Sequence, residues 1–213
     1  MTTEPVDGYV PLSALPRPSG TLDRLEDVVR AAHDGVPGAV PELLALLKPV
    51  IARYCRARIG GRDLSYLSAD DVAQEVCIAV LQAVAGYEDR GGSFLHLVRA
   101  IAANKVADAF RAVARDRSRP VPDLPEFRET PGDDPESRTL TADLGARLGR
   151  LMAGMPRLHQ EVLTLRVVVG LTSAETAKAL GITPGNVRVT QFRALAKLRE
   201  EITEKGVAEA WRG

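Results

Sequence analysis

GLTSAETAKALGITPGNVRVTQFRALAKLR, residues 170–199, decides the fold of this 213-residue chain. Thr172 and Glu175 have the spacing of a capping box, which predicts that a short helix begins here. Gly181 can end that helix with a positive φ, and Pro184 suits the first turn of the helix that follows. Two short helices joined by a glycine turn predict a helix-turn-helix.

The second of these two helices carries a strongly basic surface. Residues 183–199 contain four cations and no acid, which gives this stretch a net charge of +4. Arginines pair with guanine edges and apolar groups contact thymine methyls when a helix lies in the major groove. An amphipathic helix that only faces solvent is the alternative. We expect DNA contacts from Arg188, Val189, Phe192, Arg193, Lys197 and Arg199.

Helical periodicity also fills the N-terminal half of the chain. The apolar spacing over residues 43–54 predicts a helix that Pro49 should kink or split. Ser68, with an acid three residues later, predicts the start of a second helix, on which valines recur every fourth residue up to position 84. Ser93 can cap a third, long helix. No alternation is long enough to build a sheet, so the sequence predicts an all-α fold.

The third helix becomes basic toward its end and leads into a segment of opposite character. Residues 99–119 contain six cations and two acids, a net charge of +4. Residues 120–137 contain five prolines and six acids against one arginine, a net charge of −5. Prolines exclude a helix here, so we expect an extended acidic linker between two small helical domains, or a plain spacer. The expected divisions are a flexible leader at 1–20, a helical bundle at 21–118, the linker at 119–138, a helix-turn-helix domain at 139–203 and a tail at 204–213.

Composition argues against several other classes of protein. The chain has 28 cations and 28 acids, so its formal net charge of zero indicates no class by itself. The cysteines Cys55 and Cys77 and three scattered histidines provide neither the roughly four ligands of a zinc site nor a nucleophile beside a base. The sequence therefore predicts no metal, no cofactor and no enzymatic activity. A polar N-terminus and the lack of about 18 consecutive apolar residues predict a cytoplasmic protein with no membrane partner.

Separated motifs in both halves resemble those of bacterial RNA polymerase sigma factors of the extracytoplasmic-function type, within the sigma-70 family. Residues 69–75 (ADDVAQE) are similar to the acidic run of sigma region 2, and residues 93–104 are similar to a later helix of that region. Residues 155–188 are similar to the entry and the helix-turn-helix of region 4. Residues 187–195 look most like the actinobacterial sigma-D/ShbA group. The resemblance implies a region 2 bundle and a region 4 helix-turn-helix joined by the linker.

This resemblance implies partners for both regions. Core RNA polymerase, through the coiled coil of its β′ subunit, would be bound by Asp70, Asp71, Gln74 and Glu75. The −10 promoter element, including its unstacked single strand, would be bound by Asn104, Lys105, Asp108, Arg111 and Arg115. Region 4 would read the −35 element as double-stranded DNA. The polymerase β subunit and an anti-sigma factor are further implied partners.

Other interpretations stay open for these residues. Acids at a helix start also stabilise the helix dipole, which explains Asp70 and Asp71 equally well. A structural Asn104 and a solvated basic tail would explain the end of the third helix. Residues 97–99 are Leu, Val and Arg where many sigma factors carry Trp, Leu and Tyr, which puts aromatic stacking there in doubt. A helix-turn-helix regulator that acts without polymerase is the alternative function, and a helical adaptor is a third.

Overall fold

The computed structural model describes residues 24–59, 67–87, 92–116, 151–152 and 154–210, with side chains as far as Thr203 apart from that of Asp116. These ranges contain helices and no strand, which confirms the predicted all-α fold. The predicted leader and acidic linker lie outside the described residues. The helices are α1 Leu25–His33, α2 Ala39–Ile59, α3 Ala69–Ala85, α4 Phe94–Asp116, α6 Arg157–Leu163, the π-helix η2 Thr164–Val169, α7 Ser173–Leu180 and α8 Pro184–Ala210.

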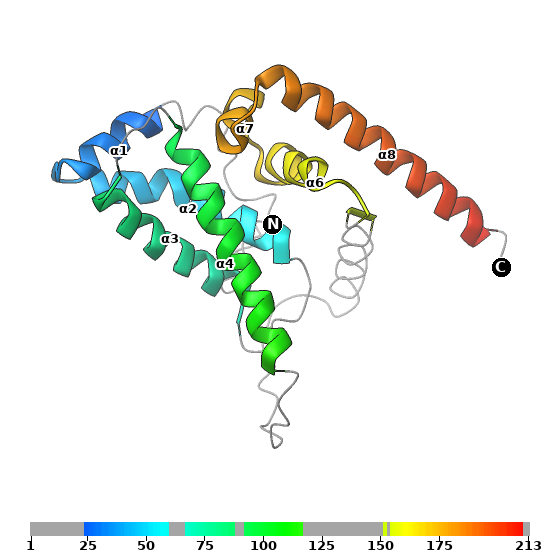
Figure 1. Cartoon of the computed structure of the whole chain (residues 1–213), viewed down its shortest axis with the longest axis horizontal. Coiled ribbons are helices and arrows are strands. Elements are labelled where there is room, and N and C mark those ends of the chain that lie inside the picture. Colours follow the sequence, from blue (N-terminus) through cyan, green and yellow to red (C-terminus); the bar gives the residue numbers. More distant parts are fainter. Residues whose placement is uncertain (1–23, 60–66, 88–91, 117–150, 153, 211–213) are drawn as a thin grey trace, which may run out of the picture.

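Helices α1 to α4 form a bundle around a core of mostly aliphatic side chains (Figure 1). Leu43 and Ile51 of α2 are at most 1 % exposed, and all four valines of the predicted stripe on α3 are buried. Phe94 at the start of α4 is fully buried, and its ring meets that of Tyr87 edge to face with centroids 4.9 Å apart. The valine stripe therefore packs where its period of about four residues predicted.

The helix expected to kink or split at Pro49 is not divided there. Helix α2 is continuous from Ala39 to Ile59 with Pro49 inside it. A proline in a helix interior removes one hydrogen bond and costs about 3 kcal/mol. Leu47 and Ile51, on either side of the proline, are at most 1 % exposed. We infer that their burial holds both halves of α2 in one helix against this local cost.

Side-chain hydrogen bonds fix the starts of α3 and α4. The Ser68 hydroxyl accepts from the backbone N–H of Asp71 at 3.1 Å, and the N–H of Ser68 donates to Asp71 Oδ2 at 2.9 Å, so the predicted capping box is present. At α4, Ser93 Oγ accepts from the Leu95 N–H at 3.3 Å, as expected of a cap. The Ser93 hydroxyl also donates to Glu26 at 2.8 Å, which ties the start of α4 to α1.

The C-terminal helices pack against this bundle through a shared core. Leu165 and Val169 of η2 and Ala179 of α7 are at most 2 % exposed and belong to the same buried cluster as Ile51 and Val98. Helix η2 lies against α2, and α7 lies against α4 (Figure 1). The helical periods of the sequence did not indicate this contact. Helix α8 leaves the shared core and continues to Ala210, through most of the stretch expected as a tail.

Replacing Asp71 by Ala should remove the capping box of α3 and lower the free energy of unfolding by about 1 kcal/mol at neutral pH. Hydrogen bonds from Ser68 lower the pKa of Asp71 below its ordinary value of 3.8. Because the pKa is lower in the folded protein, the carboxylate of Asp71 stabilises the fold fully above pH 3.8. This stabilisation is lost as the pH falls through the lowered pKa of the folded state. Urea unfolding followed by circular dichroism, in a series from pH 7 downward, measures both effects.

The difference between wild type and Asp71→Ala should stay constant from neutral pH down to about pH 5 and shrink below about pH 4. Glu200→Ala, which removes an exposed acid from α8, is the matched control and should change the free energy of unfolding by less. An Asp71→Ala deficit that grew as the pH fell would contradict the assigned role of this carboxylate.

Candidate nucleic-acid and protein interfaces

The helix-turn-helix is formed by α7 and α8, with the caps that the sequence predicts. The hydroxyl of Thr172 accepts from the N–H of Glu175 at 3.2 Å, and the N–H of Thr172 donates to Glu175 Oε2 at 2.6 Å. Gly181 ends α7 with φ 67°, a left-handed conformation that favours glycine. Thr183 Oγ1 accepts from the N–H of Asn186 at 3.2 Å and so caps α8. The turn and both helix starts are therefore set by local hydrogen bonds.

The orientation of α8 is fixed from its inner face. Val187 and Ala194 are fully buried, against residues of α6 and α7. Arg166 of η2 donates from Nε to Gln191 Oε1 at 3.0 Å and from a second nitrogen to the carbonyl oxygen of Leu171. This arginine joins η2, the turn before α7 and the middle of α8. The outer face of α8 is consequently held in one orientation relative to α7.

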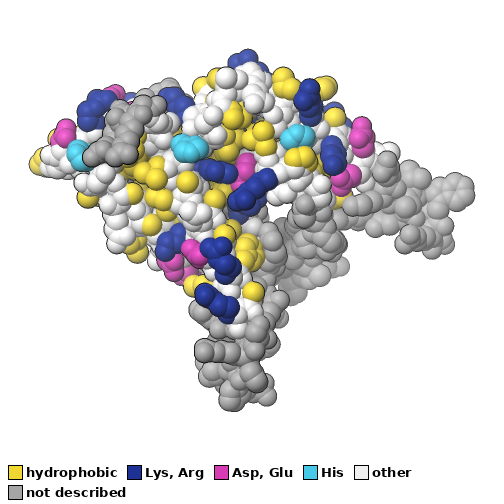
Figure 2. Space-filling model, in the orientation of Figure 1, with side chains coloured by type: hydrophobic (Ala, Val, Ile, Leu, Met, Phe, Trp, Pro, Cys, Tyr) yellow, Lys and Arg dark blue, Asp and Glu magenta, His cyan; other side chains and the backbone are white. Residues whose placement is uncertain are grey.

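That outer face combines cations with exposed apolar side chains. Phe192 is 74 % exposed and Val189 is 48 % exposed. Arg188, Arg193 and Arg199 are exposed and Lys197 is half-buried. Figure 2 shows hydrophobic and cationic side chains together along the upper edge of the molecule, where the first part of α8 lies. The structure thus gathers the predicted residues of α8 on one accessible helix.

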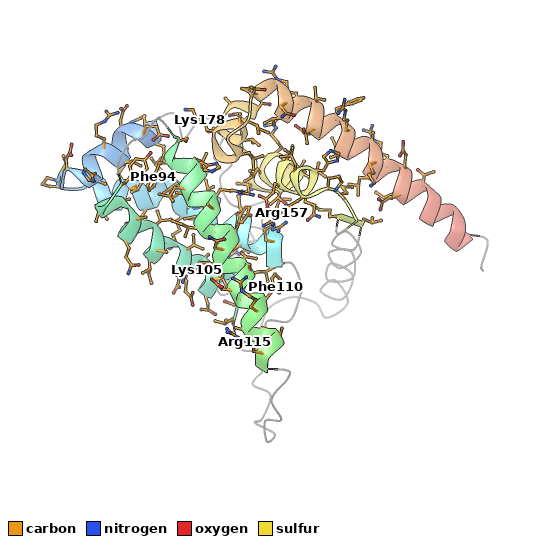
Figure 3. The ribbon with its side chains drawn as sticks, viewed as in Figure 1. Phe94, Lys105, Phe110, Arg115, Arg157 and Lys178 are labelled. Atoms are coloured by element: carbon orange, nitrogen blue, oxygen red, sulfur yellow. The ribbon has the colours of Figure 1, made fainter. Side chains whose placement is uncertain are left out.

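On α4, acidic partners accompany the predicted DNA-binding cations. Lys105 Nζ lies 3.1 Å from Glu75 Oε2 of α3, and Arg111 pairs with Asp108 one turn before it. The hydrogen bond from Arg111 lowers the pKa of Asp108, which keeps this carboxylate ionised. Asn104 and Arg115 are exposed on the same helix. Figure 3 shows Lys105, Phe110 and Arg115 following one another down α4.

The four predicted residues of α3 are all exposed, and three of them have partners in this structure. Arg56 of α2 binds Asp70 through two hydrogen bonds of 2.9 Å each, and Asp71 belongs to the capping box. Glu75 pairs with Lys105. These contacts within the fold are therefore sufficient to explain acidic residues at positions 70 and 71.

Comparisons with known proteins place both halves of the chain in one family. The family model for sigma-70 region 2 matches residues 43–116, and the model for sigma-70 region 4 matches residues 145–198. The chain is 46 % identical to the extracytoplasmic-function (ECF) RNA polymerase sigma factor SigD of Mycobacterium tuberculosis, over 93 % of each protein. It is 43 % identical to ShbA of Streptomyces griseus, over 81 % of this chain and 92 % of the relative.

The chain is an ECF sigma factor of the sigma-70 family. It is a transcription initiation factor that binds core RNA polymerase and directs it to promoters, and the resemblance to the sigma-D/ShbA group is confirmed. A regulator acting without polymerase is not favoured. The solved structure of CnrH in complex with the cytosolic domain of CnrY shares the fold, with a TM-score of 0.56 and 23 % identity over 85 % of this sigma factor and 99 % of that chain.

Metal binding and membrane crossing find no support within the described ranges. No group of three or more His, Cys, Asp or Glu side chains there could hold a metal ion. None of the described helices of this sigma factor has the length and apolar character needed to cross a bilayer. Burial raises the pKa of the Cys55 thiol to about 12, so this thiol stays protonated near neutral pH.

Sequence reasoning missed a charged cluster between regions 2 and 4 of this sigma factor. Glu161 of α6 is 1 % exposed and is surrounded by Tyr54, Arg58 and Arg99 of region 2. Burial, and next the negative charge of Glu161, raise the pKa of Tyr54 well above its ordinary value. The sequence contained a signal, because Glu161 lies three residues after Leu158 and four before Leu165, the spacing of one apolar helix face.

Proposed function

We propose that this sigma factor reads the −35 element with the outer face of α8, binds the −10 element with the C-terminal half of α4, and holds core polymerase with the start of α3. The observation that carries the proposal is the exposed Phe192, flanked by Arg188 and Arg193 on a helix whose first turns contain no acid. Each of the three surfaces has its own chemistry.

The α8 surface has the composition of a major-groove reader. Arg188 and Arg193 can form bidentate hydrogen bonds to guanine, and Val189 and Phe192 can contact thymine methyl groups. Lys197 and Arg199, further along the helix, suit phosphates, which orient the protein without reading sequence. Exposed apolar groups gain free energy when a partner covers them, at about 25 cal/mol per Å². Contact with DNA therefore explains a large exposed phenylalanine on a basic helix better than permanent exposure to solvent does.

The α4 surface suits a single strand whose position must be adjustable. Asp108 balances Arg111 before DNA arrives, and a phosphate can replace the carboxylate as the partner of this guanidinium. Arg115 lies further along the helix and is exposed. Asn104 offers an amide that can donate to and accept from a base edge. A basic surface of this kind follows the backbone of an opened strand.

The start of α3 is the proposed surface for core polymerase and, by the family resemblance, for the coiled coil of its β′ subunit. Gln74 is exposed and Glu75 pairs with Lys105 of α4. This ion pair connects the polymerase surface on α3 with the DNA surface on α4. The polymerase β subunit and an anti-sigma factor are further proposed partners of this chain. CnrH, the relative in fold, was solved bound to the cytosolic domain of CnrY.

Replacing Gln74 and Glu75 together by Ala should weaken binding to core polymerase at least about tenfold, which corresponds to about 1.4 kcal/mol. The fold should persist because an exposed ion pair such as Glu75–Lys105 contributes at most about 1 kcal/mol. Fluorescence anisotropy of labelled sigma factor titrated with core polymerase measures the affinity. Gln82→Ala, an exposed position further along α3, is the control, and equal affinity for both variants would contradict this surface.

Arg188→Ala should lose about 1–3 kcal/mol of binding to a promoter identified by run-off transcription of genomic fragments with core polymerase. Competition between that promoter and a copy with a scrambled −35 element measures the loss of discrimination. Arg157→Ala removes an exposed arginine from α6 and should preserve discrimination. Wild-type preference in the Arg188→Ala holoenzyme would show that α8 does not read the element through this side chain.

The double replacement Arg111→Glu and Arg115→Glu should leave promoter binding through α8 in place but prevent strand opening near −10. The new acids repel the displaced strand, and the acid introduced at position 111 would also repel Asp108 one turn before it. Permanganate reactivity of unpaired thymines on the same promoter measures opening. Arg24→Glu with Arg30→Glu makes the same change of charge at exposed positions of the N-terminal bundle. Normal opening by the α4 variant would count against the role proposed for this helix.

A further inference from the structure

The first turn of α8 carries an exposed amide that is not among the residues predicted to contact DNA. Asn186 lies two residues before Arg188, in the part of α8 that follows the turn after α7 (Figure 1). A helix turns by about 100° per residue, so Asn186 projects within about 60° of Val189 and within about 20° of Arg193. Both of these residues belong to the outer face of α8. Asn186 therefore extends this face to the beginning of the helix.

The side chain of Asn186 is held by the residue one turn further along α8. The hydroxyl of Thr190 donates to Asn186 Oδ1 at 3.2 Å. Thr190 is 5 % exposed and lies toward the inner side of the helix, one turn after the fully buried Val187. A buried hydroxyl without a hydrogen-bonding partner is costly, so this contact favours one position of the Asn186 side chain. The amide oxygen is consequently turned toward the body of the protein.

Amide geometry then decides what Asn186 can offer to DNA. The oxygen and the nitrogen of an amide lie on opposite sides of its carbon, so Nδ2 faces outward while Oδ1 faces Thr190. The amide nitrogen donates hydrogen bonds and accepts none. Asparagine recognises adenine by accepting from N6 and donating to N7 together, which requires both atoms to face the base. Asn186 cannot form this pair of bonds while Thr190 holds its oxygen.

Base edges in the major groove differ strongly in how they meet an outward NH2 group. Guanine presents two acceptors, O6 and N7, whereas adenine places the N6 donor beside its N7 acceptor. Cytosine presents the N4 donor, and thymine has one acceptor, O4, beside its methyl group. A donor that cannot also accept is therefore attracted most by guanine and is opposed by the donors of adenine and cytosine.

Gly185 leaves the approach to Asn186 open. Glycine within a helix is less stable than alanine, so its presence needs a reason in packing or in contact with a ligand. Among the described residues, a Cβ at Gly185 would meet the hydroxyl oxygen of Thr183 at 3.9 Å, which is an ordinary contact distance. The packing of this region therefore does not require the missing side chain. Close approach of DNA to the first turn of α8 would require it.

We propose that Asn186 is a further specificity-determining residue of this sigma factor and selects a guanine in the −35 element, with Thr190 as its positioning residue. The proposal rests on the proposed function, because it needs the outer face of α8 to lie in the major groove. Asn186 makes the contact, and Thr190 sets which atom of the amide faces the base. The hydrogen bond between them thus converts a side chain able to read adenine into one that reads guanine.

A promoter library tests this assignment. Every position of the −35 element is randomised in the promoter used for Arg188→Ala, and the fragments bound by holoenzyme are sequenced. Wild-type holoenzyme should prefer guanine over adenine by about five- to tenfold at one position, and Asn186→Ala should remove the preference at that position alone. Asn186→Asp presents an acceptor to the groove and should select cytosine there instead.

Replacements of Thr190 separate positioning from general stability. Thr190→Val removes the hydroxyl, frees the amide to rotate, and should raise the preference for adenine relative to guanine by about fivefold at the same position. Thr190→Ser keeps a hydroxyl and should preserve the selection of guanine. Gln82→Ala removes an exposed amide from α3 and should keep all wild-type preferences. If circular dichroism shows that Thr190→Val has lost helix, the base selected by Asn186→Asp decides the question.

Several results would overturn the assignment. Asn186→Ala could keep every wild-type base preference, or lose affinity equally for all sequences, which marks a phosphate contact. Asn186→Asp, or a folded Thr190→Val variant, could still select guanine as strongly as wild type. Failure of the proposed function gives a different pattern, in which neither wild-type nor Arg188→Ala holoenzyme shows any base preference within the −35 element.

Discussion

The structure depends on the burial of η2 and α7 against α2 and α4, with the buried, ion-paired carboxylate of Glu161 at the centre. This sigma factor has few aromatic residues, so its cores consist mainly of valine, leucine and alanine side chains that each bury modest area. Region 2 completes its own core partly with Leu165 and Val169 of region 4. The burial of Glu161 is tolerated because Tyr54 and Arg99 donate hydrogen bonds to it and Arg99 supplies a counter-charge.

This division of contacts leaves the proposed functional surfaces outside the packed core. Val187 and Ala194 hold α8 from one side, so the helix can present Phe192 to solvent without loss of orientation. The local hydrogen bonds of Thr172 and Thr183 set the turn independently of region 2. Region 4 can therefore keep its internal geometry whether or not it is docked on region 2, which a module that must reach a distant DNA element requires.

The sequence predicted what depends on neighbouring residues and missed what depends on distant ones. The caps at Ser68 and Thr172 involve residues three positions apart, and their chemistry is visible in the sequence. Helical periodicity indicated which face of α3 is buried. It could not indicate which other helix that face packs against. For this reason the sequence could not show that Glu161 contacts Tyr54, which lies 107 positions earlier in the chain. The break expected at Pro49 was likewise predicted from the local cost of a proline, without the tertiary packing that offsets this cost.

The two proposed DNA surfaces differ in how their charges are compensated, and this difference fits the tasks proposed for them. The first turns of α8 are free of acid, so its arginines are available to a rigid duplex whose base edges occupy fixed positions. On α4, Arg111 is already paired with Asp108, and Lys105 with Glu75 of α3, so a DNA strand that bound there would have to displace carboxylates. Such exchange lowers the net attraction to any duplex and favours a strand that is flexible enough to present its phosphates where the carboxylates were. If α8 and α4 have the roles proposed above, the −35 contacts would form on the intact duplex, and the −10 contacts would form once a strand is free to displace the carboxylates.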